Sequence, residues 1–199
     1  MAIIVEHDKR KRDILEKSLE LFCREGFDDV TFQKIADACG VTRTTLYIYF
    51  RNKQEIFVWS IRHLTEQIER RLVEIIDDKT ISADECLRQV VCWIITECGN
   101  YHRLFKVLLP YLISIEKEGI DSGSRVRRRV IRIKHILNSI LIRGTKEGVF
   151  KPIPIKVMNG MFYGFIEMTM FRIAIMGEFD AKEICDMVSV AVDGITLKK

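Results

Sequence analysis

The scarcity of helix-breaking residues is the feature that most restricts the fold of this chain. Proline disrupts a helix interior, and it occurs only at positions 110, 152 and 154 of the 199 residues. The long segments between prolines repeat their apolar residues with the period of a helix that buries one face. No segment shows a strand–turn–strand pattern, and no unit recurs at a fixed period. We therefore predict an all-α protein with about nine helices.

The first predicted helix spans residues 8–25, with Asp8 as its N-cap and Gly26 as a left-handed C-cap. On this reading the basic run Lys9–Arg12 lies in the first turn, where the helix dipole disfavours cations. Either this end of the helix is simply solvated or phosphates lie near it, and the sequence leaves both interpretations open.

Capping residues also place the following helices. A Thr or Asn before an apolar-periodic run is a favoured N-cap, and a Glu three positions later completes a capping box. Residues of this kind are Thr31, Thr42 and Asn52, the last followed by Glu55. The predicted helices lie at about 31–38, 42–49, 52–77, 83–98, 101–117, 124–147, 155–176 and 180–196.

The segment 40–53, GVTRTTLYIYFRNK, contains a run of β-branched and aromatic residues that a propensity scale assigns to a strand. The flanking caps and the apolar face of the preceding helix favour a short helix instead. Its periodicity turns Leu46 and Phe50 inward and Tyr47, Ile48 and Tyr49 outward. The sequence has no acidic residue between Gly40 and Gln54, which is unusual for a solvated helix face.

Two short helices joined by a turn that contains glycine are typical of a helix-turn-helix. On the outward face, hydroxyl and arginine side chains suit phosphates and base edges, and an aliphatic side chain suits a thymine methyl group. The alternative is an inert surface or a protein contact. We interpret the face as one that DNA covers.

Residues 8–57 resemble the DNA-binding domain of the TetR family of transcriptional regulators. The similarity lies in LELFCREGFDDVT followed by FQKIADACGVTRTTLYIYFRNKQEIF. Within it, the Ile-Ala, Gly-Val-Thr, Leu-Tyr-x-Tyr-Phe and Asn-Lys elements stand in the order and spacing of the family. This region is about a quarter of the chain; the remainder matches the family only in the number and length of its helices.

The resemblance implies DNA contacts for a defined set of residues: Thr31, Gln33, Thr42, Arg43, Thr44, Thr45, Tyr47, Tyr49 and Lys53. In the family, the positions of Arg43 and Thr44 face bases, and the position of Lys53 grips a phosphate. Position 33 is often Arg in the family, and Gln33 would favour adenine over guanine. Position 44 is often a small residue, so Thr44 departs from the pattern.

We predict two domains, a helix-turn-helix domain over residues 1–52 and a helical domain over residues 53–199. The resemblance implies that the second domain binds a small ligand and forms a homodimer through its last two helices. Segments 155–176 and 180–196 are indeed apolar on more faces than a monomer needs, and Gly160 and Gly164 permit close approach of helices. The expected nucleic-acid partner is pseudo-palindromic, double-stranded operator DNA with half-sites about 34 Å apart.

The ligand is expected to be small and largely apolar. Residues that could line its site are Trp93, Tyr101, Phe105, Tyr111, Met161, Phe165, Glu167 and Met168, although core packing explains each of them as well. Glu167 could meet a cationic or hydroxyl-bearing ligand, or pair with an arginine across the dimer. The basic run Arg125–Arg132 could bind an anion or form a solvated helix end.

The distribution of charge does not by itself locate a nucleic-acid site. Residues 1–55 hold ten Lys or Arg and ten Asp or Glu, whereas residues 125–156 hold ten basic residues and one acid. A basic stretch is often the electrostatic footprint of nucleic acid, yet here it lies outside the helix-turn-helix. The DNA-binding prediction therefore rests on local geometry.

Other classes of protein are disfavoured. The six cysteines form no CxxC pair, so we interpret them as small buried hydrophobes and expect no disulfide, metal or cofactor. The N-terminus lacks the order of a secretory signal, and a membrane span over 157–176 would bury Asn159, Glu167 and Arg172. We expect a cytoplasmic protein.

Three functional hypotheses follow. The first is a repressor that a small ligand releases from its operator, and the second is a DNA-binding regulator controlled by a protein partner. The third, an all-α enzyme, is remote because the sequence contains no HExxH, nucleophile elbow or Gly-rich phosphate loop.

Overall fold

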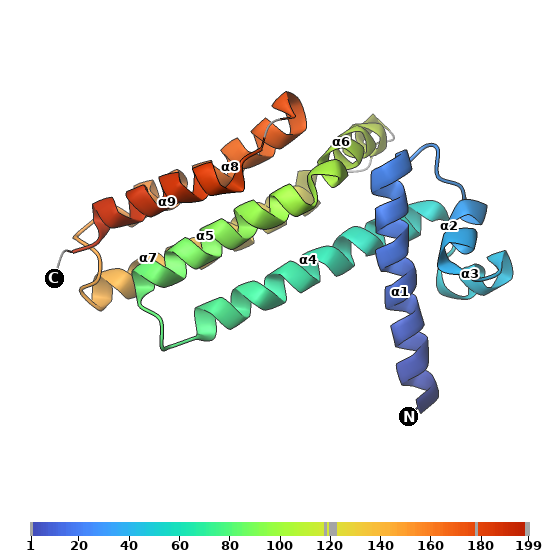
Figure 1. The fold of residues 1–199 in the computed structure, drawn as a ribbon, viewed down its shortest axis with the longest axis horizontal. Coiled ribbons are helices and arrows are strands. Elements are labelled where there is room, and N and C mark those ends of the chain that lie inside the picture. The colour runs from blue at the N-terminus through green and yellow to red at the C-terminus, as the bar shows by residue number, and fades with distance from the viewer. Residues whose placement is uncertain (1, 118, 120–122, 178, 198–199) are drawn as a thin grey trace. The chain divides into compact units, whose positions relative to one another are not determined.

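The computed structural model describes the backbone of residues 2–117, 119, 123–177 and 179–197, and the side chains of 6–117, 119, 127–177 and 179–197. Within these ranges the chain is helical and has no strand, which confirms the predicted all-α class (Figure 1). The elements are α1 (Ala2–Glu25), α2 (Phe32–Cys39), α3 (Arg43–Tyr49), α4 (Lys53–Asp77), α5 (Ala83–Asn100), α6 (His102–Lys117), α7 (Gly123–Lys146), α8 (Ile155–Phe171), η1 (Arg172–Met176) and α9 (Ala181–Ile195).

The chain divides into two compact units. Unit 1 comprises residues 1–69 and 106–111, and unit 2 comprises residues 70–105 and 112–199. Helix α4 runs without interruption through parts of both units, and the domain boundary predicted at residue 52 falls at its first turn.

In unit 1, α1 packs on α2 and α2 packs on α3. An aromatic cluster forms part of this unit, with Tyr111 of α6 placed 4.8 Å from both Phe27 and Phe57 between ring centroids. On α4, the ring of Trp59 lies 4.6 Å from the Lys11 ammonium and 4.8 Å from the Arg62 guanidinium. The Lys11 contact joins α1 to α4, and the Arg62 contact lies within α4.

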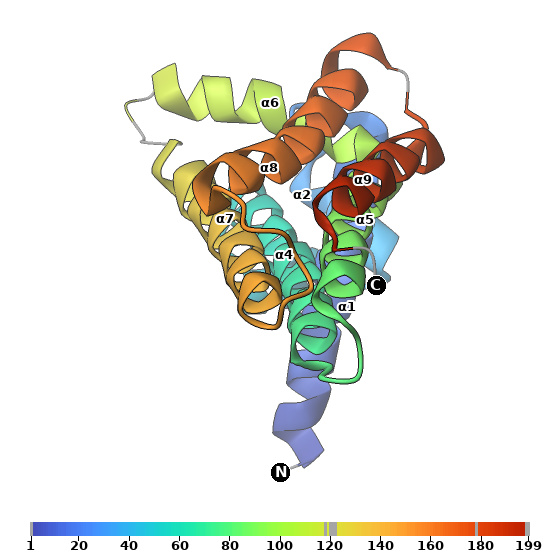
Figure 2. The same cartoon turned by 90° about the vertical axis from the view of Figure 1, so that its left-hand side faces the viewer.

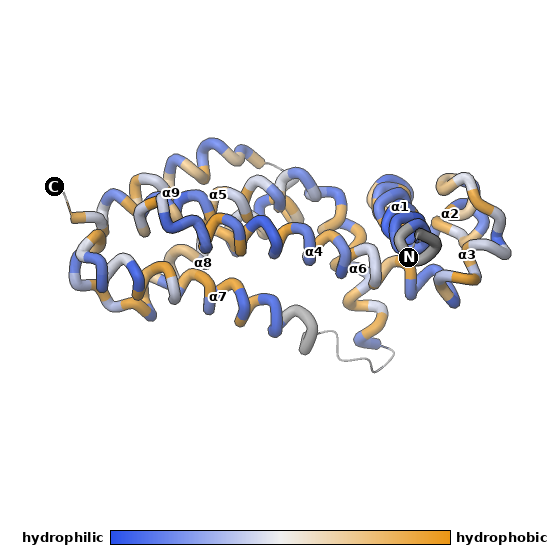
Figure 3. Tube along the Cα trace, turned by 90° about the horizontal axis from the view of Figure 1, so that it is seen from below, coloured by the Kyte–Doolittle hydropathy of each residue, from blue (hydrophilic) through white to orange (hydrophobic). Residues whose placement is uncertain are grey.

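Helix α1 starts earlier than predicted, at Ala2 instead of residue 8. No breaker separates residues 2–7 from the rest of the helix, so the helix continues through Asp8, whose carbonyl accepts a bond from Arg12 Nε at 3.4 Å. Asp8 is therefore not an N-cap, and the run Lys9–Arg12 lies beyond the first turn, where the dipole penalty is absent. Figure 3 shows the mostly hydrophilic character of this helix.

In unit 2, α5 is central and packs against α7, α8 and α9 (Figures 1 and 2). The predicted break between residues 98 and 101 is displaced, because α5 continues to Asn100 and the break falls at Tyr101, before α6 begins at His102. Gly99 serves packing instead, since a side chain there would collide with the ring of Phe179. The predicted helix 155–176 ends in a π-helical segment, η1, which Gly177 closes in the left-handed conformation.

Two cysteines of α5 behave as the predicted small hydrophobes. Cys86 and Cys98 are buried, and burial raises the pKa of Cys98 to about 12 and raises that of Cys86 as well. Their thiols therefore stay protonated at neutral pH. In the described part of the chain, none of the helices combines the length and the apolar character that crossing a membrane requires.

Candidate nucleic-acid interface

The helix-turn-helix forms as the caps predict. Thr31 Oγ1 accepts a hydrogen bond from the Lys34 backbone N–H at 3.2 Å, and Thr42 Oγ1 accepts one from Thr45 at 3.1 Å. Between the helices, Gly40 has a φ of 67°, a left-handed conformation that residues with a side chain rarely adopt. Two N-caps and one left-handed glycine therefore define the turn between α2 and α3.

Helix α3 has the predicted inward face, and Tyr47 and Ile48 are exposed as predicted, but Tyr49, also predicted to point outward, is half-buried. Leu46 and Phe50 are buried, whereas Tyr47 is 51% exposed and Ile48 is 69% exposed. The Tyr47 ring packs 4.5 Å from the ring of Phe32 between centroids, so α2 supports it from behind. The outer face of α3 therefore combines an exposed tyrosine and an exposed isoleucine with Arg43 and Thr44.

Arg43 is held in place by Tyr47. Its Nη2 donates to the Tyr47 hydroxyl at 3.3 Å, and its guanidinium carbon lies 5.8 Å from the centroid of the Tyr47 ring. Phe32, Tyr47 and Arg43 therefore form a stack that runs outward from α2. This arrangement limits the conformations of an arginine that could donate to a base or a phosphate.

The other predicted residues of α3 differ in exposure. Thr44 is exposed, while Thr45 is half-buried and its hydroxyl lies 2.8 Å from that of Thr42. Tyr49 is half-buried, with its ring 4.4 Å from the ring of His7 in α1. His7 could not be predicted as a neighbour of Tyr49, because nothing in its local sequence pattern indicates contact with a residue so distant in the chain.

Gln33, on the exposed side of α2, has a defined amide orientation. Its Nε2 donates to Asp37 Oδ1 at 2.7 Å, one helical turn away. The second amide hydrogen and the Oε1 acceptor remain to meet an adenine edge, which needs one donor and one acceptor. Asp37 is a second residue of this surface that the sequence analysis did not predict.

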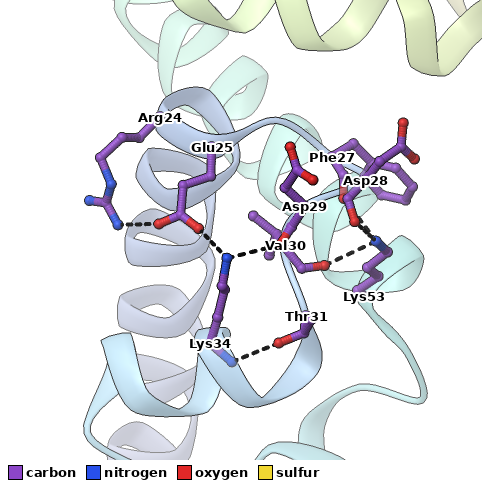
Figure 4. A network of polar contacts seen from close by, with 9 residues as sticks. All are labelled: Arg24, Glu25, Phe27, Asp28, Asp29, Val30, Thr31, Lys34 and Lys53. Carbon is purple, nitrogen blue, oxygen red and sulfur yellow. Dashed lines mark hydrogen bonds and ion pairs between the residues drawn. The ribbon is translucent and has the colours of Figure 1, made fainter.

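Lys53, in the first turn of α4, contacts the loop that joins α1 to α2 (Figure 4). Its ammonium donates to the carbonyls of Phe27 at 2.9 Å, Asp28 at 3.0 Å and Val30 at 3.0 Å. It also lies 4.7 Å from the centroid of the Phe27 ring. A lysine ammonium has three N–H donors, so all of them point at this loop.

The N-terminus of α4 carries the predicted cap with one change in detail. Asn52 Oδ1 accepts from the Glu55 backbone N–H at 2.8 Å, and Glu55 Oε2 accepts from the N–H of Arg51 at 2.6 Å. In a standard capping box the second bond would come from the cap residue itself. The effect is similar, because both bonds fix the chain between α3 and α4.

The eight predicted ligand residues are divided between the two units. Tyr111 belongs to unit 1, where its hydroxyl accepts from Gln54 Nε2 at 3.3 Å. The other seven belong to unit 2: Trp93, Tyr101, Phe105, Met161, Phe165, Glu167 and Met168. Of these, Met161 and Glu167 are exposed. The buried Trp93 Nε1 has no hydrogen-bond partner among the described residues.

Nothing in the described residues suggests a metal centre, since no group of three or more His, Cys, Asp and Glu side chains is arranged to hold an ion. Of the basic run Arg125–Arg132, the side chain of Arg125 lies outside the described residues. Arg127, Arg128 and Arg132 are exposed on α7.

The capped turn, the buried inner face of α3 and its exposed acid-free outer face define a helix-turn-helix DNA-binding protein. Residues 14–58 match the family model described as "Bacterial regulatory proteins, tetR family". The helix-turn-helix region therefore matches that of the TetR family of transcriptional regulators, and the similar proteins described next are named as regulators.

Three similar proteins extend this comparison over most of the chain. The Fatty acid metabolism regulator protein of Bacillus subtilis (strain 168) is 25% identical over 166 residues, which are 81% of this chain and 84% of that protein. A TetR transcription regulator from Haloarcula marismortui ATCC 43049 has a TM-score of 0.79 at 16% identity, over 96% of this chain and 100% of the other.

The third is the structure of the regulator FadR from Bacillus subtilis in complex with stearoyl-CoA. It gives a TM-score of 0.68 at 22% identity, over 92% of this chain and 98% of the other. At these identities the two solved structures establish a shared fold and nothing finer.

Proposed function

We propose that this chain is a homodimeric repressor in the cytoplasm that binds operator DNA through α2 and α3 and is released by a long-chain acyl thioester of coenzyme A. The observation that carries the DNA-binding part is the outward face of α3. It presents Arg43, Thr44, Tyr47 and Ile48 on a segment without acidic residues. Such a face is costly in water and suits the major groove.

The proposed contacts follow from chemistry. Arg43 and Gln33 read base edges, and Ile48 meets a thymine methyl group. The hydroxyl-bearing residues donate to phosphates or bases; they are Thr31, Thr42, Thr44, Thr45, Tyr47 and Tyr49. Phosphate contacts of this kind set the register of α3 in the groove, and base contacts supply specificity.

The dimer proposal rests on an exposed apolar stripe along α8 and η1. The residues of this stripe are separated alternately by four and three positions along the chain. This spacing is typical of a helix that packs lengthwise against another helix. They are Val157, Met161, Gly164, Met168, Phe171 and Ile175. Val157, Phe171 and Ile175 are each more than half exposed, which is an unfavourable state for aliphatic and aromatic side chains unless a partner covers them.

A matching stripe follows α9 and continues to residue 197, with Met187, Val190, Gly194 and Leu197. A side chain added at Gly164 or Gly194 would meet no atom within 4 Å, so both glycines face outward into open space. Small outward residues between larger ones let two helices approach closely. We infer that a second copy of the chain covers both stripes and forms a four-helix contact.

The ligand proposal draws on the similarity to the Fatty acid metabolism regulator protein and to the regulator FadR solved with stearoyl-CoA, both from Bacillus subtilis. Two features of this chain support it. Among the described residues the buried Trp93 Nε1 has no acceptor, and a thioester carbonyl would provide one. The exposed arginines of α7 offer positive charge for the phosphates of coenzyme A.

The test is a selection of bound DNA from a random pool, followed by titration of the selected operator complex with stearoyl-CoA. We expect a pseudo-palindromic operator and release of the DNA by stearoyl-CoA but not by free coenzyme A or stearate. Selection of no sequence would reject the DNA-binding surface. Release by none of these compounds would reject the ligand and favour control by a protein partner.

A further inference from the structure

The two lysines at either side of the α1–α2 loop together hold four consecutive backbone carbonyls. Lys53 Nζ bonds those of Phe27, Asp28 and Val30, and Lys34 Nζ bonds that of Asp29 at 3.1 Å. Figure 4 shows the two ammonium groups approaching the loop from α4 and from α2. Carbonyl groups that converge in this way form a binding site for a cation, and a lysine side chain fills it.

The loop is the part of the chain that sets where α2 begins. Val30 is fully buried, and the next residue, Thr31, is the N-cap of α2. Gln33 follows within the first turn of α2. A shift of the loop would therefore also move Thr31 and Gln33, which belong to the proposed DNA surface.

Binding of a phosphate by Lys53 would require it to leave these partners. All three ammonium hydrogens are engaged, and the side chain is half-buried against the Phe27 ring. If the Lys53 ammonium moved to a phosphate, three backbone carbonyls would lose their hydrogen-bond donor, and the ammonium would gain contacts to a single phosphate. A lysine in that position is better placed to organise the surface than to touch DNA.

We infer that Lys53 is a positioning residue that fixes the start of α2, and through it Thr31 and Gln33, rather than a ligand of a DNA phosphate. This inference rests on the proposed DNA surface for its effect on binding. The inference also states that the α1–α2 loop depends on the Lys53 ammonium. This statement concerns the protein without DNA, so it can be tested independently of DNA binding.

The substitution Lys53→Arg separates the two roles. A guanidinium binds phosphate at least as well as an ammonium, so a phosphate ligand would tolerate the change. The planar fork cannot direct three donors at carbonyls that surround a single point. We therefore expect Lys53→Arg to weaken operator binding by at least about tenfold, with a change of base preference at the pair read by Gln33.

Lys53→Met provides the complementary measurement. Each neutralised phosphate contributes about 0.9 to the slope of log K against log[salt]. We expect Lys53→Met to weaken operator binding while the slope of log K against log[salt] stays equal to that of the wild type. Arg51→Met is the matched control, because it removes the same charge two residues away without removing a donor to the loop.

Amide hydrogen exchange of the free proteins completes the test. We expect faster exchange at residues 27–34 in both Lys53 variants and a wild-type rate in Arg51→Met. Wild-type operator affinity in Lys53→Arg together with a slope reduced by about 0.9 in Lys53→Met would overturn the inference. So would unchanged exchange at residues 27–34 in the Lys53 variants, whether or not the protein binds the expected DNA.

Discussion

The outer face of α3 and the outer stripe of α8 both expose large apolar side chains, but different residues surround them. On α3, Ile48 stands among threonines, tyrosines and an arginine; on α8, Val157 and Phe171 stand among other apolar residues and a glycine. The first mixture matches the edges of base pairs and their phosphates, and the second matches another protein helix. On these two faces, the residues around the exposed apolar side chains indicate what kind of molecule covers them.

The largest effect is expected from a charge in the α9 stripe. Val190 is 72% exposed in one protomer, so Val190→Asp should leave the protomer folded but prevent the proposed dimer. Loss of the second half-site contact should weaken operator binding by about 100-fold or more. Analytical ultracentrifugation and a DNA titration measure the two consequences.

Val73→Asp is the control for this change, since Val73 is exposed on α4 and lies outside both stripes. It should stay dimeric and bind the operator normally. A dimeric Val190→Asp variant would show that α9 does not form the contact.

A smaller effect is expected on α3. Tyr47→Ala removes the stack on Phe32 and the support of Arg43, and should weaken operator binding by about tenfold to a hundredfold. Tyr47→Phe keeps the stack and loses only the hydroxyl, so it should lose less. Both variants should remain dimers, and equal losses would mean that the hydroxyl group rather than the stack matters. Fluorescence anisotropy with labelled operator measures both affinities.

A change of specificity without a large change of affinity is expected at position 33. Gln33→Arg should replace the preference for adenine by a preference for guanine at one pair in each half-site, because arginine donates twice to guanine. Selection from a random pool before and after the substitution provides the measurement. An unchanged base preference would remove Gln33 from the base-reading set.

The smallest effect concerns Glu25 at the end of α1. Hydrogen bonds from Lys34 and then Arg24 lower the pKa of its carboxyl group below the ordinary value of 4.5. Because the folded pKa is the lower one, the stabilisation is complete above about pH 4.5 and is lost as the pH falls through the folded value. Urea unfolding of wild type and Glu25→Gln should converge in acid, whereas Glu20→Gln should follow wild type throughout.

The sequence was sufficient to predict those features of the fold that depend only on residues close together in the chain. Thr31, Thr42 and Gly40 act locally, and the inward direction of Leu46 follows from helical periodicity alone. The predicted start of α1 was wrong. Asp8 is a good capping residue and was taken as the first boundary of the helix, but nothing interrupts the helix before it.

Contacts between distant segments could not be predicted. The acceptors of Lys53 lie 23 to 26 positions away, and the hydroxyl that Gln54 contacts lies 57 positions away. Helical periodicity shows which face of a helix is buried but not which residue of another segment lies against it. For the same reason Tyr111 was grouped with residues of unit 2, although it packs in the aromatic cluster of unit 1.

The ring of Trp59, which lies close to Lys11 and Arg62, can serve as a fluorescent reporter of unfolding. The chain has two tryptophans, and the other, Trp93, belongs to unit 2, so each unit carries one intrinsic fluorophore. Lys11 and Arg62 place two cations close to the first indole. Replacing either tryptophan by phenylalanine would leave a protein whose emission reports the unfolding of a single unit, without any attached dye.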